Sequence, residues 1–265
     1  IESYAPGCRK EISLQPNGLL WAQKDRTALT WMNAYIDGCP VTERAGYLVE
    51  TNAFWYDMLC FAIEMESKYG RKTSGFVEKW SPVRDMVAEN YQKMFWMPDK
   101  GYLADYVDNN GQNTDVRPNQ LFALAVHHQP VDDTVLGSMM NVVDRELVTS
   151  RGIRTLSPRD LKYRGVYEGT QRERDLAYHQ GCAWPALLLP YARIKFRMDG
   201  AAFCKRAEWL MEGFYDDLNK HGVGMFSELY DGDPPHEPHG AISSAMSTAA
   251  LLYVENLINK YKEER

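Results

Sequence analysis

The sequence predicts an all-α protein built as an array of helical hairpins. Apolar residues recur at spacings of three and four along most of the chain, which is the spacing of one helix face. Short and long connections alternate between these segments, and no pair of alternating strands competes with them. Taking every second expected helix, the starts fall near residues 50, 117, 181 and 241, a repeat of roughly 60 to 65 residues that is typical of stacked or closed helix pairs.

The first two expected helices form one hairpin. One covers residues 50–69. The other begins at Ser81 and Pro82, because serine is a favoured N-cap and proline suits the first helical position. Apolar residues then recur on one face of this helix, at Val83, Val87, Tyr91 and Met94.

The later helices follow from the same spacing. Apolar stripes predict helices over 117–128, 133–148, 181–197, 201–219 and 241–260. The stripe of 133–148 consists of Val135, Met139, Val142 and Leu147, and that of 201–219 of Phe203, Leu210, Phe214 and Leu218. The last helix carries Ile242, Ala245, Ala249, Leu252 and Leu257.

The lengths of the connections predict where a functional site lies. Short connections near 70–80, 129–132 and 198–200 are followed by long polar ones at 97–116, 149–180 and 220–240, and the opening 50 residues resemble one more. If the helices alternate in direction, all the long loops emerge at one end of the array. Loops enlarged beyond what packing requires usually carry function, so we expect the site at that end.

The composition excludes several classes of protein. With 265 residues and 45% hydrophobic content, the chain can bury a sizeable core as a single domain over residues 1–265. No run of about 18 apolar residues suggests a membrane span. The net charge of −6 is accompanied by no basic tract, so we expect neither a membrane nor a nucleic acid as partner.

The cysteines indicate a reducing compartment such as the cytoplasm. They are odd in number and show no metal-ligand spacing, which is typical of reduced thiols: Cys8, Cys39, Cys60, Cys182 and Cys204. The chain begins at Ile1 rather than methionine, so we expect a further part of the protein upstream.

The long loops carry the side chains that sugars require. They contain TWMN with Arg44 and Glu50, GYLADYV, DVRPNQ, YHQGCAWP and FSELYDGDPPHEPHG. Aromatic rings can stack on the apolar faces of a sugar, while carboxylates, amides and guanidinium groups bind its hydroxyls. Two carboxyl groups are sufficient for glycoside hydrolysis. We find neither metal-ligand spacing nor a phosphate-binding loop, and therefore expect no cofactor and no metal.

The order of these motifs resembles the α-1,6-glucosidase module of glycogen debranching enzymes. The resemblance covers about residues 18–258 through TWMN, VTER, VETNAFWY, RPNQ, RTLSP, AYHQGCAWP and SELYDGDPPHEPHG. It implies an (α/α)6 toroid of helical hairpins that hydrolyses with inversion. It also implies that Glu228 is the general base, and that the TWM loop, RPNQ and HQGCAWP line a glucose pocket.

The expected substrate-binding residues come from these motifs and from the nearby loops. They are Trp31, Arg44, Glu50, Arg117, Asn119, His179, Gln180 and Trp184. The two tryptophans lie in or beside long polar loops and are predicted to stack on sugar rings. Each residue type also has a structural alternative: Arg117 can pair with Asp105 or Asp115, the histidine and glutamine can cap a helix, and the tryptophans can belong to the core.

One position departs from the family pattern. The family usually reads TWMD, where the aspartate is the expected general acid, whereas this chain has Asn33. An amide cannot donate a proton in that role. Asp37 or Glu50, in or after the same loop, could replace it.

The length also departs from the family, because six helix pairs at the observed repeat need roughly 370 residues. The chain is therefore expected to be the C-terminal part of a longer toroid, or an incomplete one.

Two functions remain open at this point. The first is an inverting, exo-acting α-1,6-glucosidase that acts on glycogen-like branched α-glucans. The second is a carbohydrate-binding or catalytically impaired glucosidase-like module, since Asn33 replaces the acid. A sugar 2-epimerase is a third possibility, but it would need a pair of basic histidines, and only His179 lies in a suitable loop.

Overall fold

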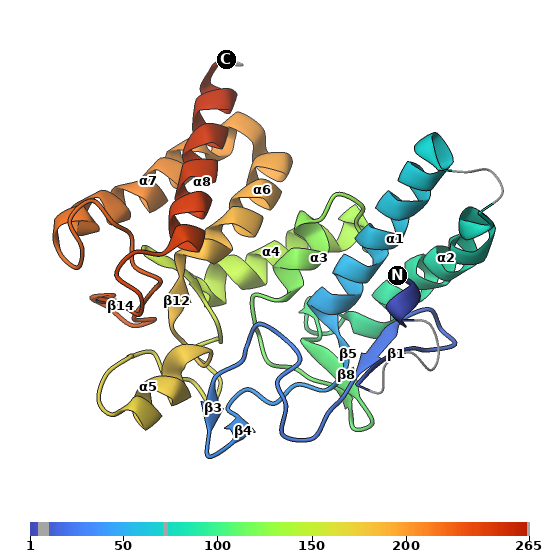
Figure 1. Cartoon of the computed structure of the whole chain (residues 1–265). Coiled ribbons are helices and arrows are strands. Elements are labelled where there is room, and N and C mark those ends of the chain that lie inside the picture. The colour runs from blue at the N-terminus through green and yellow to red at the C-terminus, as the bar shows by residue number, and fades with distance from the viewer. Residues whose placement is uncertain (5–10, 71–73, 264–265) are drawn as a thin grey trace.

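Most helices lie at one end of the molecule and the short strands at the other. The structure is a computed structural model that describes residues 1–4, 11–70 and 74–263. In Figure 1 the strands and the short helix α5 (Gln171–Tyr178) lie below the other helices. The long loops therefore gather at one end, as their lengths predicted.

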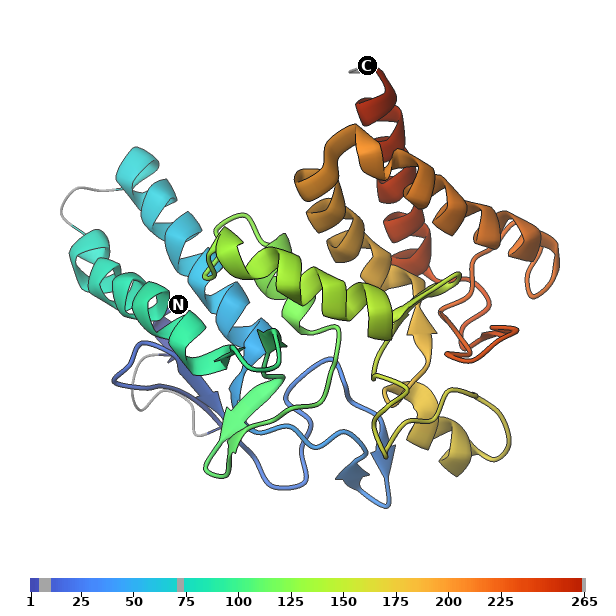
Figure 2. The same ribbon diagram turned by 180° about the vertical axis from the view of Figure 1, so that it is seen from behind.

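The helices form an open arc. In its inner row α1 (Val49–Tyr69) packs against α3 (Gln120–Ala125), α3 against α6 (Leu188–Asp199), and α6 against α8 (Ala245–Glu263). Outside this row, α2 (Phe76–Phe95) packs against α1, and α7 (Cys204–Tyr215) against α8. α4 (Asp133–Glu146) lies between the two ends of the arc, so α1 and α2 lie far from α7 and α8 (Figures 1 and 2).

Packing rather than capping determines where α2 starts. We expected this helix to begin at Ser81, but it begins at Phe76 and contains Pro82. Trp80 is buried between Phe76 and Trp55, with ring centroids 6.3 and 6.0 Å apart. Burying aromatic rings outweighs the one backbone hydrogen bond that the proline removes.

Helices form the body of the fold, as expected, but short antiparallel strands join the loops, so the chain is not purely α-helical. One sheet has the order β1 (Ile12–Leu14), β2 (Leu20–Ala22), β5 (Gly46–Leu48), β8 (Tyr106–Asp108) and β9 (Gly111–Gln112). The other has the order β10 (Val148–Thr149), β11 (Gly152–Arg154), β12 (Ala183–Trp184), β13 (Leu229–Tyr230) and β14 (Pro238–His239). Two hairpins complete the set, β3 (Tyr35–Ile36) with β4 (Cys39–Pro40) and β6 (Trp96–Met97) with β7 (Tyr102–Leu103).

These strands could not be predicted because each has only two or three residues, too few to show an alternation of apolar and polar side chains. The helix α5 lies inside the predicted loop 149–180, although a capping box between Thr170 and Glu173 marks its start. Short 3-10 helices cover Glu2–Tyr4, Pro185–Leu187, Gly200–Phe203 and Asp216–Asn219. The 3-10 turn at Pro185–Leu187 delays α6 by seven residues relative to the expected start at 181.

Two further expectations concern the whole chain. Cys39, Cys60, Cys182 and Cys204 are free thiols, while Cys8 lies outside the described residues. Within residues 1–4, 11–70 and 74–263, no helix combines the length and the hydropathy that crossing a membrane requires.

A histidine joins the start of the α3–α4 loop to α1. The backbone N–H of His128 donates to Asp57 Oδ1 at 2.8 Å, and its ring nitrogens lie 2.8 Å from Asp57 Oδ1 and 3.0 Å from Glu64 Oε1. Burial alone would lower the pKa of His128, but the hydrogen bonds to both carboxylates outweigh it and raise the pKa.

We expect His128→Gln to destabilise the protein in a pH-dependent way. Since the folded-state pKa is raised, the stabilisation is fully present below the unfolded value of about 6.5 and is lost as pH rises through the folded value. Thermal unfolding from about pH 5.5 to 8 should show the largest loss at the acid end. His127→Gln, at the exposed neighbour, should show no such trend, and a pH-independent loss in His128→Gln would contradict the ion-pair role.

Candidate functional site

The loop end of the helices contains a hollow of about 710 Å³. We call it the Glu228 hollow, and most of its lining comes from three stretches of the chain. Residues 33–35 contribute Asn33, α5 contributes Asp175 and Tyr178, and the segment around β13 and β14 contributes Glu228 and His239. The sequence-predicted base and the amide at the expected acid position therefore face the same space.

Glu228 is held at both carboxylate oxygens. The Tyr178 hydroxyl donates to Oε1 at 2.7 Å, and the Ala241 backbone N–H donates to Oε2 at 3.0 Å. The backbone N–H of Glu228 also donates to the Ala241 carbonyl at 3.0 Å. This carboxylate is therefore oriented before any ligand arrives.

The TWMN segment is anchored so that Asn33 stays at the surface of the hollow. Trp31 Nε1 donates to Asn119 Oδ1 at 2.8 Å, and Met32 is fully buried. Asn33 follows these two anchors and is exposed. Its amide can donate or accept hydrogen bonds to a sugar, but it cannot act as a general acid.

The structure does not bring Asp37 into the Glu228 hollow. Asp37 and Gly38 form the two-residue turn between β3 and β4, with φ values of +52° and +72°. The side chain of Asp37 is 80% exposed and pairs with Arg172 at 2.6 Å. It is therefore a turn residue with an ion pair, and its expected role as a replacement acid has no geometric support.

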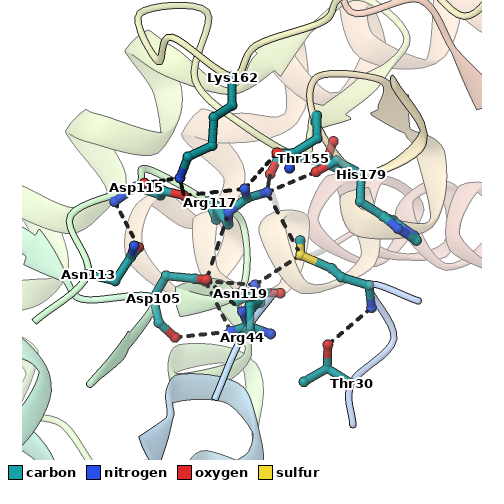
Figure 3. A network of polar contacts seen from close by, with 12 residues as sticks. Thr30, Arg44, Asp105, Asn113, Asp115, Arg117, Asn119, Thr155, Lys162 and His179 are labelled. Carbon is teal, nitrogen blue, oxygen red and sulfur yellow. Dashed lines mark hydrogen bonds and ion pairs between the residues drawn. The ribbon is translucent and has the colours of Figure 1, made fainter. Parts of the chain in front are cut away.

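Glu50, the other expected replacement, belongs to a buried ion network. Arg44 Nη2 donates to Glu50 Oε2 at 2.7 Å. Arg44 Nε donates to Asp105 Oδ2 at 2.6 Å (Figure 3). All three side chains are almost completely buried. Burial alone would lower the pKa of Arg44, but the charges of Asp105 and Glu50 outweigh it and raise the pKa. Both oxygens of Glu50 are thus engaged away from the Glu228 hollow.

Asn119 extends this network towards the TWMN loop. Its Nδ2 donates to Asp105 Oδ1 at 2.7 Å, while its Oδ1 accepts from Trp31. Asn119 is fully buried, so it connects two parts of the scaffold instead of meeting a ligand.

Arg117 and Gln180 also serve the scaffold. Arg117 donates to the backbone carbonyls of Thr155 at 3.1 Å and His179 at 2.8 Å, and to Gln180 Oε1 at 2.7 Å. It pairs with Asp115 at 3.3 Å and lies 3.8 Å from Asp105, so both partners considered from the sequence contact it. Figure 3 shows this arginine at the centre of the loop contacts.

A second hollow, of about 520 Å³, lies beside this network. Arg44, Arg117 and Gln180 line it, together with Thr42 and Lys162. Of the eight predicted substrate-binding residues, three line this second hollow and none lines the Glu228 hollow.

The aromatic residues of the two motifs pack on one another. The rings of His179 and Trp184 stack with centroids 5.6 Å apart, and Trp31 meets them edge-on at 5.3 and 5.8 Å. His179 is 1% exposed, and among the described residues neither ring nitrogen has a hydrogen-bond partner. Burial, followed by the charge of Arg117, lowers its pKa to about 3, so the ring is neutral.

Trp184 has no open face for a sugar. It is 5% exposed, and Tyr178 contacts it beside His179, with ring centroids 5.0 Å apart. This burial favours the core alternative for Trp184 over the expected stacking role. Trp31 is half-buried, and its stacking role stays a prediction.

Sequence reasoning missed Tyr178 and Asp175, which also line the Glu228 hollow. Tyr178 directly precedes the HQG motif, but its contact with a residue 50 positions away could not be read from the pattern. No group of three or more histidine, cysteine, aspartate or glutamate side chains suited to a metal ion occurs within the described parts of the chain.

A helical arc with an oriented carboxylate at its loop end is the arrangement of a glycoside hydrolase-like domain. The chain belongs to the amylo-alpha-1,6-glucosidase family, whose pattern matches residues 1–253. It is 24% identical to the glycogen debranching enzyme of Saccharomyces cerevisiae over 81% of this chain. The chain spans only 17% of the length of that relative.

Solved structures show the same fold. Neutral trehalase from Saccharomyces cerevisiae matches 80% of this chain and 38% of its own, with a TM-score of 0.60 and 12% identity. A mannosylglycerate hydrolase from Thermus thermophilus matches 78% of this chain and 44% of its own, with a TM-score of 0.53 and 13% identity.

We expect Arg44→Met to destabilise the protein by about 3 to 5 kcal/mol, because it leaves Glu50 and Asp105 buried without their cation. Urea denaturation measures this loss. Lys93→Met is the matched control, since Lys93 pairs with Glu89 at an exposed site and should cost at most about 1 kcal/mol. Equal costs in the two variants would show that the buried network does not stabilise the fold.

Proposed function

We propose that the chain is part of an inverting, exo-acting α-1,6-glucosidase that removes glucose from glycogen-like branched α-glucans. Membership of the amylo-alpha-1,6-glucosidase family supports the reaction class. The observation that carries the assignment is the oriented carboxylate of Glu228 in a hollow of about 710 Å³, a volume typical of small-ligand sites.

In this mechanism Glu228 is the general base. It takes a proton from a water molecule, whose oxygen attacks the anomeric carbon while the bond to the leaving oxygen breaks. The leaving oxygen must then gain a proton. Asn33 cannot supply it, so turnover should depend strongly on how good the leaving group is.

A second candidate function follows from the same position. Asn33 lies in the hollow, whereas Asp37 and Glu50 are engaged elsewhere. These three observations favour a carbohydrate-binding or catalytically impaired module that keeps the base and has lost the acid.

We further propose that helices outside these 265 residues complete an (α/α)6 toroid. The chain matches 38% and 44% of the two solved relatives, and its own helices form an open arc. The four described free cysteines support a reducing compartment such as the cytoplasm.

Kinetics on two substrates test the proposal. α-Glucosyl fluoride needs little acid help, whereas isomaltose, with its α-1,6 bond, needs a proton on its leaving oxygen. We expect Glu228→Gln to lower kcat/KM on the fluoride by about 10²- to 10⁴-fold, because an amide cannot accept the proton. Glu237→Gln, on an exposed carboxylate of the same loop, is the control and should be neutral. Full activity in Glu228→Gln would contradict the assignment.

The Asn33→Asp variant separates the two functions. If only the acid is missing, kcat/KM on isomaltose should rise by about 10²-fold or more while the rate on the fluoride changes little. Binding of isomaltose without turnover of either substrate, in the wild type and in Asn33→Asp, would instead establish the carbohydrate-binding function.

A further inference from the structure

We propose that Tyr178 is a positioning residue for the Glu228 carboxylate, acting together with a backbone donor that only a glycine at position 240 allows. The inference rests on the proposed role of Glu228. It is carried by the contacts of this carboxylate, which receives one hydrogen bond on each oxygen: the Tyr178 hydroxyl on Oε1 at 2.7 Å and the Ala241 N–H on Oε2 at 3.0 Å.

Two donors on different oxygens fix the plane of the carboxylate. A glutamate side chain has three rotatable bonds, and Glu228 is only half-buried, so packing alone does not select its direction. Hydrogen bonds to a carboxylate are short and strong, so the two donors hold its plane in one orientation. The remaining lone pairs are free to meet a water molecule in the hollow.

The tyrosine is itself held rigidly. Tyr178 is the last residue of α5, and its ring contacts His179 at 4.6 Å, Trp184 at 5.0 Å and Tyr167 at 5.9 Å between centroids. Burial, followed by the hydrogen bond to Glu228, raises the pKa of Tyr178. Its hydroxyl therefore stays protonated and continues to donate throughout the neutral range.

The backbone donor depends on Gly240. This residue has φ +73°, and a Cβ added to it would lie 2.5 Å from Glu228 Oε2 and 3.0 Å from Glu228 Cβ. Any other residue would push the carboxylate away from the Ala241 N–H. The tyrosine and the glycine thus control opposite oxygens of the same group.

Tyr178→Phe tests the inference in the complete chain. On α-glucosyl fluoride we expect kcat to fall about 10- to 100-fold, as for the loss of one hydrogen bond to a charged group, with KM little changed. Gly240→Ala should lower kcat through the other oxygen.

A matched control separates positioning from general stability. The Tyr163 hydroxyl donates to Asp233 at 2.8 Å, so Tyr163→Phe removes a similar bond outside the Glu228 hollow. It should leave both kcat and KM unchanged. Equal effects of Tyr178→Phe and Tyr163→Phe would overturn the positioning role.

A readout without turnover keeps the two proposals distinguishable. In protein with ¹³C-labelled glutamate carboxyls, the Glu228 signal is the one absent from Glu228→Gln. At one fixed neutral pH its chemical shift should change in Tyr178→Phe, which removes the hydrogen bond to Oε1, but not in Tyr163→Phe. An unchanged chemical shift with an unchanged kcat overturns the inference while Glu228 stays the base. Full activity in Glu228→Gln, or no hydrolysis of the fluoride by the wild type, overturns the proposed function, and the NMR signal still decides whether Tyr178 positions the carboxylate.

Discussion

The loop end of this protein depends on one buried cation, Arg44, and the two carboxylates that it holds. Arg44 precedes β5, Glu50 lies in the first turn of α1, and Asp105 follows β7, so their ion pairs connect three separate segments. Buried charges cost several kcal/mol each unless they are paired and hydrogen-bonded. Asn119 donates a further hydrogen bond to Asp105 and accepts one from Trp31, so the network also holds the TWMN loop in place.

This network explains why several residues expected to bind a ligand also hold the loops together. Arg117 holds loops of the second half of the chain together, since it donates to the backbone carbonyls of Thr155 and His179. Guanidinium groups suit this role because one planar group can satisfy several acceptors at once. In the Glu228 hollow, by contrast, a carboxylate held by Tyr178 faces the same space as an asparagine.

The sequence predicted the parts of the fold that local periodicity determines. The helices α1 and α4 lie within a few residues of the predicted ranges 50–69 and 133–148, because apolar residues at helical spacing must face a core. The two- and three-residue strands were missed, since their pairing is set by partners far away in the chain. The Asp37-Gly38 turn was readable, because this dipeptide is a strong hairpin signal, and it would have excluded Asp37 from a catalytic role.

The site was predictable as a location but not as a set of contacts. The sequence pattern indicated Glu228 and Asn33, which line one hollow, but the burial of Trp184 and the hydroxyl contact of Tyr178 depend on tertiary packing. The exchange of aspartate for Asn33 was visible directly. Whether Asp37 or Glu50 could replace the missing acid could be judged only from the structure, which shows both engaged in other ion pairs.

In the mechanism that we propose, Glu228 activates water on the face of the sugar opposite the leaving group. Proton NMR of the glucose first released from α-glucosyl fluoride tests this most directly, because the anomers give separate signals before they interconvert. Inversion by a water-activating base predicts β-glucose as the initial product. Initial release of α-glucose would mean that a carboxylate attacks the sugar itself, and would contradict the account.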